Sequence, residues 1–304
     1  MEYVLKTNAL KKSYGHYKAL NGLTMSVPKG EIYGLVGKNG AGKTTLIRLI
    51  CVLQKPTGGE YSIYGISTKQ KEIIMARRRI GAVVETPSIY LDMTAEDNLR
   101  MQYRVLGLPS FEGIEDVLKM VGLENTGRKK VKDFSLGMRQ RLGIAVAIVG
   151  DPDFLILDEP INGLDPQGIV EMREIILKLN REYGITVLIS SHILDELSRL
   201  ATYFGFIDNG RMVKEISASE LEAACRKCMH LVVSDVKALS KVLDEIGMDY
   251  TILSDTEADV FGKINITKLV SKLSAENCEV LSMQERDENL ENYYINLVGG
   301  VSNA

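Results

Sequence analysis

The chain has 304 residues with a formal net charge of -3, and its composition is 45% hydrophobic and 25% charged. This length allows one large or two ordinary domains, and the composition is typical of an ordinary globular protein. The weak net charge gives no reason to expect a nucleic-acid-binding protein. No apolar stretch reaches the length of about 18 residues that a membrane-spanning helix needs, and the N-terminus is not built like a signal peptide. We therefore expect a cytosolic chain whose four cysteines stay reduced.

Tyr14 lies ahead of the first glycine-rich segment, in the run KKSYG. An aromatic ring at such a place can stack on a purine base, and it can equally be a half-buried tyrosine without a ligand. The residue alone does not decide between these interpretations.

A phosphate-binding loop is predicted at residues 37–44, where GKNGAGKT fits the pattern G-x-x-x-x-G-K-[ST] at every fixed position. The loop follows a buried-strand candidate at 32–36 and precedes a plausible helix at 46–50, which is the setting that the motif requires. Its glycines let backbone N–H groups turn around an anion, and the helix N-terminus adds the positive end of its dipole. A chance match is the alternative, and the flanks argue against it. The residues expected to bind the nucleotide are Gly37, Lys38, Asn39, Gly40, Ala41, Gly42, Lys43, Thr44 and Thr45.

Two of these residues have defined roles in the motif. Lys43 is expected to reach the β- and γ-phosphates, and the Thr44 hydroxyl is expected to ligate Mg²⁺. The sequence therefore predicts a nucleoside triphosphate site.

Residues 86–150 are predicted to form a helical insert in an otherwise α/β pattern. Thr94–Asp97 resembles a capping box, and apolar residues recur at helical spacing between Ile114 and Val121. Ser135 fits the N-cap of a long apolar helix. The free N–H groups there can face an anion, or the segment can be a capped helix without a ligand.

A strand predicted at 154–157 ends in two carboxylates, Asp158 and Glu159. Asp158 is expected to face the phosphate site and to hold Mg²⁺ through water. Glu159 is expected to act as general base on the attacking water. A strand that ends in a solvated acidic turn is the alternative, and the P-loop upstream argues against it.

Two further residues stand at the boundaries of predicted elements. Asp165 and Pro166 fit an N-cap followed by the first helical residue. His192 follows the strand predicted at 185–191. Taken alone, an isolated histidine is more often structural than functional.

The hairpin signal at 208–210, Asp-Asn-Gly, is expected to close the first domain, which would cover residues 1–215. Residues 216–304 then alternate between strands and helices, which predicts a small α/β accessory domain, with a ferredoxin-like fold as the candidate. Cys225 and Cys228 lie two residues apart with His230 just beyond, a spacing that zinc sites use. Because a second ligand pair is missing, we expect ordinary reduced thiols.

The P-loop, the serine-glycine helix start, the Leu-Asp-Glu-Pro strand end and the later histidine resemble the ATP-binding subunits of ABC transporters. Their order and spacing match over residues 1 to about 215. The resemblance implies an α/β P-loop NTPase of the ABC type with a helical insert and a small C-terminal α/β accessory domain. It further implies ATP and Mg²⁺ as ligands, a head-to-tail dimer of two copies, and a separate integral-membrane permease as partner. The chain itself would lie at the cytoplasmic face of a bacterial cell membrane.

The resemblance also assigns roles to single residues. Tyr14 would stack on the adenine, and Asp165 would belong to the loop that follows the Asp-Glu pair. Ser135 and Gly137 would contact the γ-phosphate held by the P-loop of the facing chain. The family motif Leu-Ser-Gly-Gly-Gln is Phe-Ser-Leu-Gly-Met here, and the serine and second glycine are retained. His192 would bond the γ-phosphate and orient Glu159 with its water.

Glu85 departs from the family pattern, because most members have glutamine where this chain has glutamate. A carboxylate only accepts hydrogen bonds and carries a negative charge, so Glu85 could ligate Mg²⁺ or repel the γ-phosphate when the metal is absent.

Glu85 resembles the glutamate of the bacitracin-resistance and lantibiotic self-protection subgroup. The C-terminal segment at 288–294 is similar to that of drug- and peptide-exporting ATPases. We expect an ATPase that drives export or expulsion of an antimicrobial peptide. The alternatives are a drug or ion exporter, a soluble non-transport ABC ATPase, and a regulator that does not hydrolyse ATP.

Overall fold

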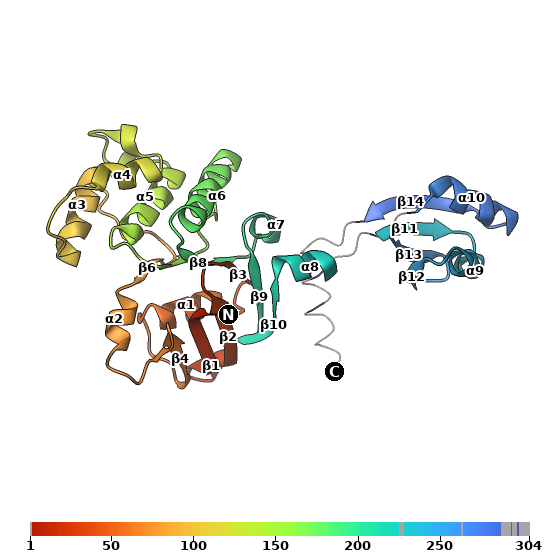
Figure 1. Ribbon diagram of the computed structural model, residues 1–304, viewed down its shortest axis with the longest axis horizontal. Helices are drawn as coiled ribbons and strands as arrows, with labels where there is room; N and C mark the ends of the chain where they lie inside the picture. Colours follow the sequence, from red (N-terminus) through yellow and green to blue (C-terminus); the bar gives the residue numbers. More distant parts are fainter. Residues whose placement is uncertain (1, 225–227, 263, 287–292, 294–296, 298–304) are drawn as a thin grey trace. The chain divides into compact units, whose positions relative to one another are not determined.

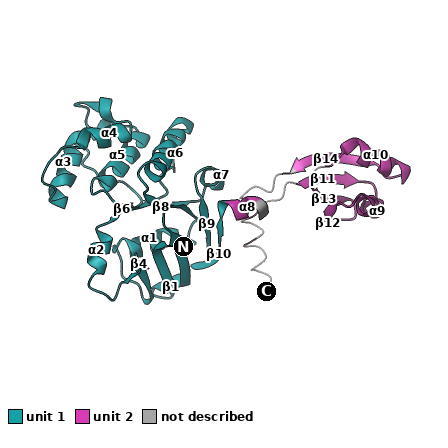
Figure 2. Cartoon of the chain, in the orientation of Figure 1, with its two compact units in different colours: residues 1–218 teal, residues 219–304 magenta. Residues whose placement is uncertain are grey.

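The computed structural model describes residues 2–224, 228–262, 264–286, 293 and 297. The chain divides into two compact units, residues 1–218 and 219–304 (Figure 2). The boundary predicted from the sequence is residue 215. In the described part of the chain, no helix combines the length and apolar character that crossing a membrane would need.

A six-stranded sheet forms the centre of the first unit (Figure 1). Its strands, in spatial order, are β10 (Arg211–Ser217), β9 (Tyr203–Asp208), β3 (Ile32–Val36), β8 (Thr186–Ser191), β7 (Phe154–Asp158) and β6 (Ile80–Val83). All neighbours are parallel except the pair β10 and β9. Every residue of β3, β7 and β8 is buried, as expected for parallel strands whose two faces are both covered. The parallel strands therefore end at one edge, where loops from distant parts of the sequence meet.

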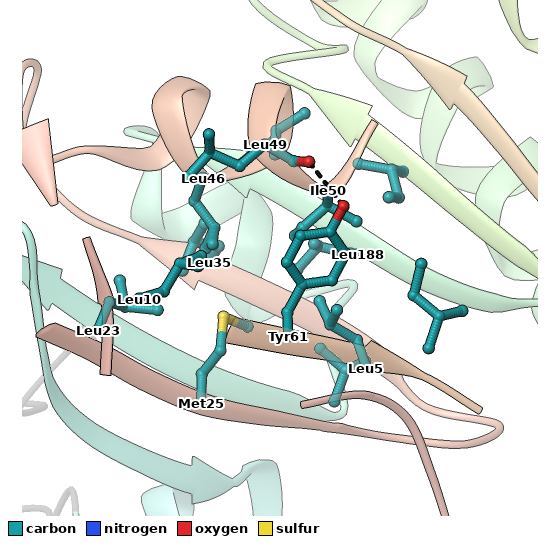
Figure 3. Packing of buried hydrophobic residues seen from close by; sticks show 14 of the residues in the cluster. Leu5, Leu10, Leu23, Met25, Leu35, Leu46, Leu49, Ile50, Tyr61 and Leu188 are labelled. Carbon is teal, nitrogen blue, oxygen red and sulfur yellow. Dashed lines mark hydrogen bonds between the residues drawn. The ribbon is translucent and has the colours of Figure 1, made fainter. Parts of the chain in front are cut away.

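A smaller antiparallel sheet packs on helix α1 (Lys43–Ile50). Its order is β2 (Tyr17–Pro28), β1 (Tyr3–Tyr14), β4 (Gly58–Ile63) and β5 (Ile66–Ser67). Leucines of α1 and of the antiparallel sheet share one core with residues of the central sheet (Figure 3). Tyr61 lies in this core, and its hydroxyl donates to the Leu49 carbonyl at 3.0 Å. This packing fixes the helix that follows the P-loop.

Helices make up the segment between β6 and β7, which is where the sequence predicts an insert. They are α3 (Ala95–Leu106), α4 (Ile114–Met120), two 3-10 turns at Glu124–Thr126 and Val131–Asp133, and α5 (Leu136–Ile148). The capping box is formed, because Thr94 accepts from the Asp97 N–H while the Asp97 carboxylate accepts from the Thr94 N–H. Ser135 caps α5 by accepting from the Met138 N–H at 3.3 Å.

The remaining helices of the first unit are α2 (Ile73–Arg77), α6 (Pro166–Arg181) and α7 (Leu194–Ser198). Asp165 caps α6 through the Gly168 N–H, as the sequence predicts. The hairpin between β9 and β10 is also confirmed, with Asn209 at φ 46° and Gly210 at φ 72°. Positive φ at both central residues is the geometry that selects Asn-Gly.

The second unit begins with α8 (Ala218–Ala224). It continues in the order β11 (Cys228–Val233), α9 (Val236–Ile246), β12 (Asp249–Ile252), β13 (Glu257–Phe261), α10 (Ile266–Ala275) and β14 (Val280–Arg286). Its strands form an antiparallel sheet in the order β12-β13-β11-β14. This β-α-β-β-α-β arrangement is the one called ferredoxin-like. The sequence misses β13, whose acidic residues alternate with buried Ala258 and Val260.

Cys228, the second cysteine of the pair, is the first residue of β11. Cys225 lies outside the described residues, as does most of the segment 288–294. His230 is buried and bonds Asp259 at 2.8 Å through its Nδ1 atom. Within the ranges that the structure describes, no three His, Cys, Asp or Glu side chains are grouped as a metal site would need.

Candidate nucleotide site

A pocket of about 320 Å³ opens at the P-loop. Its lining comes from the P-loop, the start of β2, and the loops after β7 and β8. The lining residues are Tyr17, Lys38, Asn39, Gly40, Gly42, Lys43, Thr44, Thr45, Glu159, Asn162 and His192. The structure therefore brings most of the predicted P-loop residues together with Glu159 and His192.

At two P-loop positions, Gly37 and Gly42, a side chain would clash with neighbouring backbone. A side chain on Gly37 would lie 2.6 Å from the Ile207 carbonyl oxygen. Gly42 has φ 113°, and its Cβ would lie 2.8 Å from the Ala19 oxygen. The loop is thus held close against neighbouring backbone in a conformation that larger residues cannot adopt. The backbone N–H groups at the start of α1 can then face an anion.

Lys43 lies at the base of the pocket, and its side chain is only 5% exposed. Its Nζ atom donates to the Gly37 carbonyl at 2.6 Å and lies 3.3 Å from Glu159 Oε1. A nearly buried ammonium needs partners, and these two contacts provide them. The bound phosphates of ATP would offer stronger partners to the same group.

Glu159 has a second partner, since its Oε2 atom lies 2.7 Å from His192 Nδ1. The Glu159 carboxylate is therefore held between the lysine of the P-loop and a histidine from the loop after β8. Its backbone has φ 51°, and its N–H donates to the Ser190 hydroxyl at 3.0 Å. A left-handed backbone conformation costs free energy in a residue other than glycine, and such residues are often found at functional sites.

Asp158 lies at the carboxyl end of β7 and is 2% exposed. Its Oδ1 atom accepts from Ser190 at 2.6 Å and from Thr44 at 3.3 Å. Its Oδ2 atom is buried and has no hydrogen-bond partner among the described residues. Burial is the main cause that raises the pKa of Asp158, and the charges of Glu159 and Glu85 raise it further.

These features fit a divalent cation. An unsatisfied buried carboxylate oxygen beside a threonine hydroxyl is a set of oxygen donors of the kind that Mg²⁺ prefers. A cation there would also relieve the cost of burying the Asp158 charge.

Other predicted site residues do not line the pocket. Ser135 and Gly137 are at the start of α5, and Asp165 is at the start of α6. Tyr14 bonds Gln54 through its hydroxyl, and Glu85 bonds Arg48. The binding and metal roles of these residues stay predictions.

Three contributors to the site were not foreseen. Tyr17 lines the pocket, and its hydroxyl donates to the Gly40 carbonyl at 3.3 Å. Asn162 also lines it, and Ser190 bonds Asp158 from the adjacent strand. Only the register of β7 against β8, which sets Asp158 opposite Ser190, could have revealed the last contact.

The family described as ABC transporter matches residues 20–162. The bacitracin transport ATP-binding protein BcrA of Bacillus licheniformis is 41% identical over 99% of this chain and 99% of its own length. The chain belongs to the ABC transporter family. The lantibiotic transport ATP-binding protein SrtF of Streptococcus pyogenes is 44% identical to this ABC transporter chain. The match covers 71% of this chain and 93% of the length of SrtF.

A solved structure, the dimer of an ATP-binding cassette in a post-hydrolysis state bound to ADP and Pi, superimposes with a TM-score of 0.63. It is 27% identical and covers 70% of this chain and 98% of its own length. These matches confirm the P-loop fold of the ABC type. They also confirm that this ABC transporter subunit binds ATP and hydrolyses it.

Proposed function

We propose that this chain hydrolyses ATP in the P-loop pocket, with Glu159 as the general base. The observation that carries the proposal is the position of the Glu159 carboxylate between Lys43 Nζ at 3.3 Å and His192 Nδ1 at 2.7 Å. When ATP binds, Lys43 turns to the β- and γ-phosphates, which releases one oxygen of Glu159 for a water molecule. The carboxylate then takes a proton from that water as it attacks the γ-phosphorus.

His192 has two tasks in this scheme. Its Nδ1 contact holds Glu159 in place, and in the protonated imidazole the Nε2–H can donate to a γ-phosphate oxygen. The strained backbone of Glu159, bonded to Ser190, limits the positions that the carboxylate can take. Lys43 stabilises the charge that develops on the phosphate oxygens.

Thr44 and Asp158 are the residues that would hold Mg²⁺, and Glu85 would add its charge nearby. A bound Mg²⁺ supplies charge neutralisation of the β- and γ-phosphate oxygens. The Ser190 hydroxyl orients Asp158 from β8 by donating to Oδ1. The unpartnered Oδ2 atom is the acceptor that remains for the metal or for its water.

Two copies of the chain would close head to tail over two ATP molecules. The support is the place of Ser135, Gly137 and Asp165, which cap or begin helices and are not part of the P-loop pocket of their own chain. The N-terminus of α5 offers free N–H groups to an anion, and a facing chain would supply that anion as the γ-phosphate. The dimeric cassette bound to ADP and Pi supports the pairing of two copies.

The ATPase would drive a separate membrane permease from the cytoplasmic face of the membrane. Its substrate would be an antimicrobial peptide of the bacitracin or lantibiotic type, because one bacitracin transport ATP-binding protein is 41% identical and one lantibiotic transport ATP-binding protein is 44% identical. BcrA matches this chain along its whole length, including the second unit.

Survival of cells tests this proposal. A sensitive bacterium that carries the chain with its neighbouring permease gene should tolerate more bacitracin or lantibiotic than the same strain with Glu159→Gln. Unrelated cationic drugs serve as the control and should kill both strains equally. Equal peptide sensitivity of the two strains, with both proteins expressed, would contradict the proposal.

A further inference from the structure

Arg48 and Glu85 form an ion pair next to the nucleotide site. Arg48 lies in the last turn of α1, the helix that begins with Lys43, and its Nη2 atom donates to Glu85 Oε1 at 2.5 Å. Glu85 follows the end of β6. The two side chains are 34% and 53% exposed, so ligands and solvent can reach them.

The Glu85 carboxylate acts electrostatically on the metal side of the pocket. Burial raises the pKa of Asp158 most, and the negative charge of Glu85 adds to that effect. Because β6 and β7 are adjacent parallel strands, Glu85 leaves the sheet at the same edge as Asp158 and Glu159. Three carboxylates therefore share this edge, and the phosphates of ATP would bring further negative charge to it.

The backbone of the turn that carries Glu85 is restricted. Glu85 has φ 60°, in the left-handed region that non-glycine residues rarely adopt. Two residues later, Pro87 packs on α5 so closely that a Cβ on Gly143 would lie 2.7 Å from it. The turn is thus held by α5, and the contact with Arg48 directs the carboxylate.

We propose that Arg48 is a positioning residue of the nucleotide site, which neutralises Glu85 so that its carboxylate does not oppose the phosphates of incoming ATP. The proposal rests on the proposed function, because it takes the P-loop pocket as the place where ATP binds. It concerns ATP binding and not the hydrolysis step. It gives the glutamate of this chain a counter-ion on the same helix that carries Lys43.

Equilibrium binding of a fluorescent ATP analogue, first in EDTA and then with Mg²⁺, tests the proposal. Arg48→Met should weaken binding in EDTA by about threefold to fivefold, the upper range for a partly exposed ion pair. In EDTA, the double variant with Glu85→Gln should bind ATP like the Glu85→Gln single variant, because neither has an uncompensated carboxylate at position 85. With Mg²⁺ the defect of Arg48→Met should shrink, since the metal neutralises phosphate charge.

The pair Arg100–Glu96 in α3 is a matched control, with exposed fractions of 41% and 51%. Arg100→Met and Glu96→Gln should leave ATP binding unchanged. If Arg48→Met loses its cooperative thermal transition, Arg48→Gln replaces it in the same cycle.

Two results would overturn the role of Arg48. One is an Arg48→Met chain that binds ATP like the wild type in EDTA. The other is an equal loss of affinity with glutamate and with glutamine at position 85, which would mean that Arg48 acts on ATP without Glu85. A wild-type chain that binds no ATP at all would instead overturn the proposed function.

Discussion

Two inactive variants of this chain are predicted to regain ATPase activity when they are mixed. Ser135→Arg leaves the P-loop pocket intact, because Ser135 does not line the pocket of its own chain. Lys43→Ala leaves the start of α5 intact. In a head-to-tail dimer, each site takes Lys43 from one chain and Ser135 from the other. A mixed dimer therefore has one intact site and one site with both defects.

The size of the effect follows from the pairing. Random association of equal amounts makes about half of the dimers mixed, and each mixed dimer has one of its two sites intact. About one quarter of the wild-type rate should return if the two sites act independently. The assay is phosphate release from each variant alone and from the mixture, with two affinity tags to measure the fraction of mixed dimers.

A mixture of Lys43→Ala with Glu159→Gln is the control. Both defects then lie on the P-loop side of the site, so no mixed dimer has an intact site and no activity should return. Failure of the first mixture, with mixed dimers present, would refute the shared site. Recovery in the control mixture would refute it as well.

Asp158→Asn should abolish turnover and raise the melting temperature of the nucleotide-free chain at neutral pH. Because burial raises the pKa of Asp158 in the folded chain, the folded state binds a proton that the unfolded state has lost, and stability falls as the pH rises above about 4. Melting curves of both chains from acid to neutral pH check this, and a variant that is no more stable at pH 7 would contradict it. His192→Ala should lower turnover by about 10² or more while ATP still binds, as rate and binding assays would show. Since the chain has no tryptophan, Tyr14→Trp and Tyr17→Trp each introduce a single tryptophan, whose fluorescence can be followed. ATP should quench the tryptophan fluorescence of the Tyr14→Trp chain more strongly than that of the Tyr17→Trp chain. Stronger quenching in the Tyr17→Trp chain would mean that the adenine stacks at position 17 instead.

Features that lie within one continuous stretch could be predicted from the sequence. The P-loop stands between its strand and helix, and the Asp158–Glu159 pair ends a buried strand. The hairpin at 208–210 follows from the φ angles that only Asn-Gly accepts readily. In each case local chemistry decides the conformation, so neighbouring residues are sufficient.

Contacts between distant stretches could not be predicted in this way. Ser190 meets Asp158 only because β7 and β8 are in register, and Arg48 meets Glu85 only through the turn after β6. Tyr17 reaches Gly40 because β1 and β2 form a tight hairpin beside the P-loop. Strand β13 is missed for a related reason, since two buried side chains give a weak pattern until β11 pairs with it.

Turnover and assembly of Glu159→Gln test the central claim most directly. The exchange keeps the shape of the side chain and its place beside Lys43 and His192, and removes the basic carboxylate. Phosphate release should fall by about 10² or more, while ATP binding persists and two chains elute together on size exclusion with ATP. Phosphate release at the wild-type rate would contradict the assignment of Glu159 as the base that activates water.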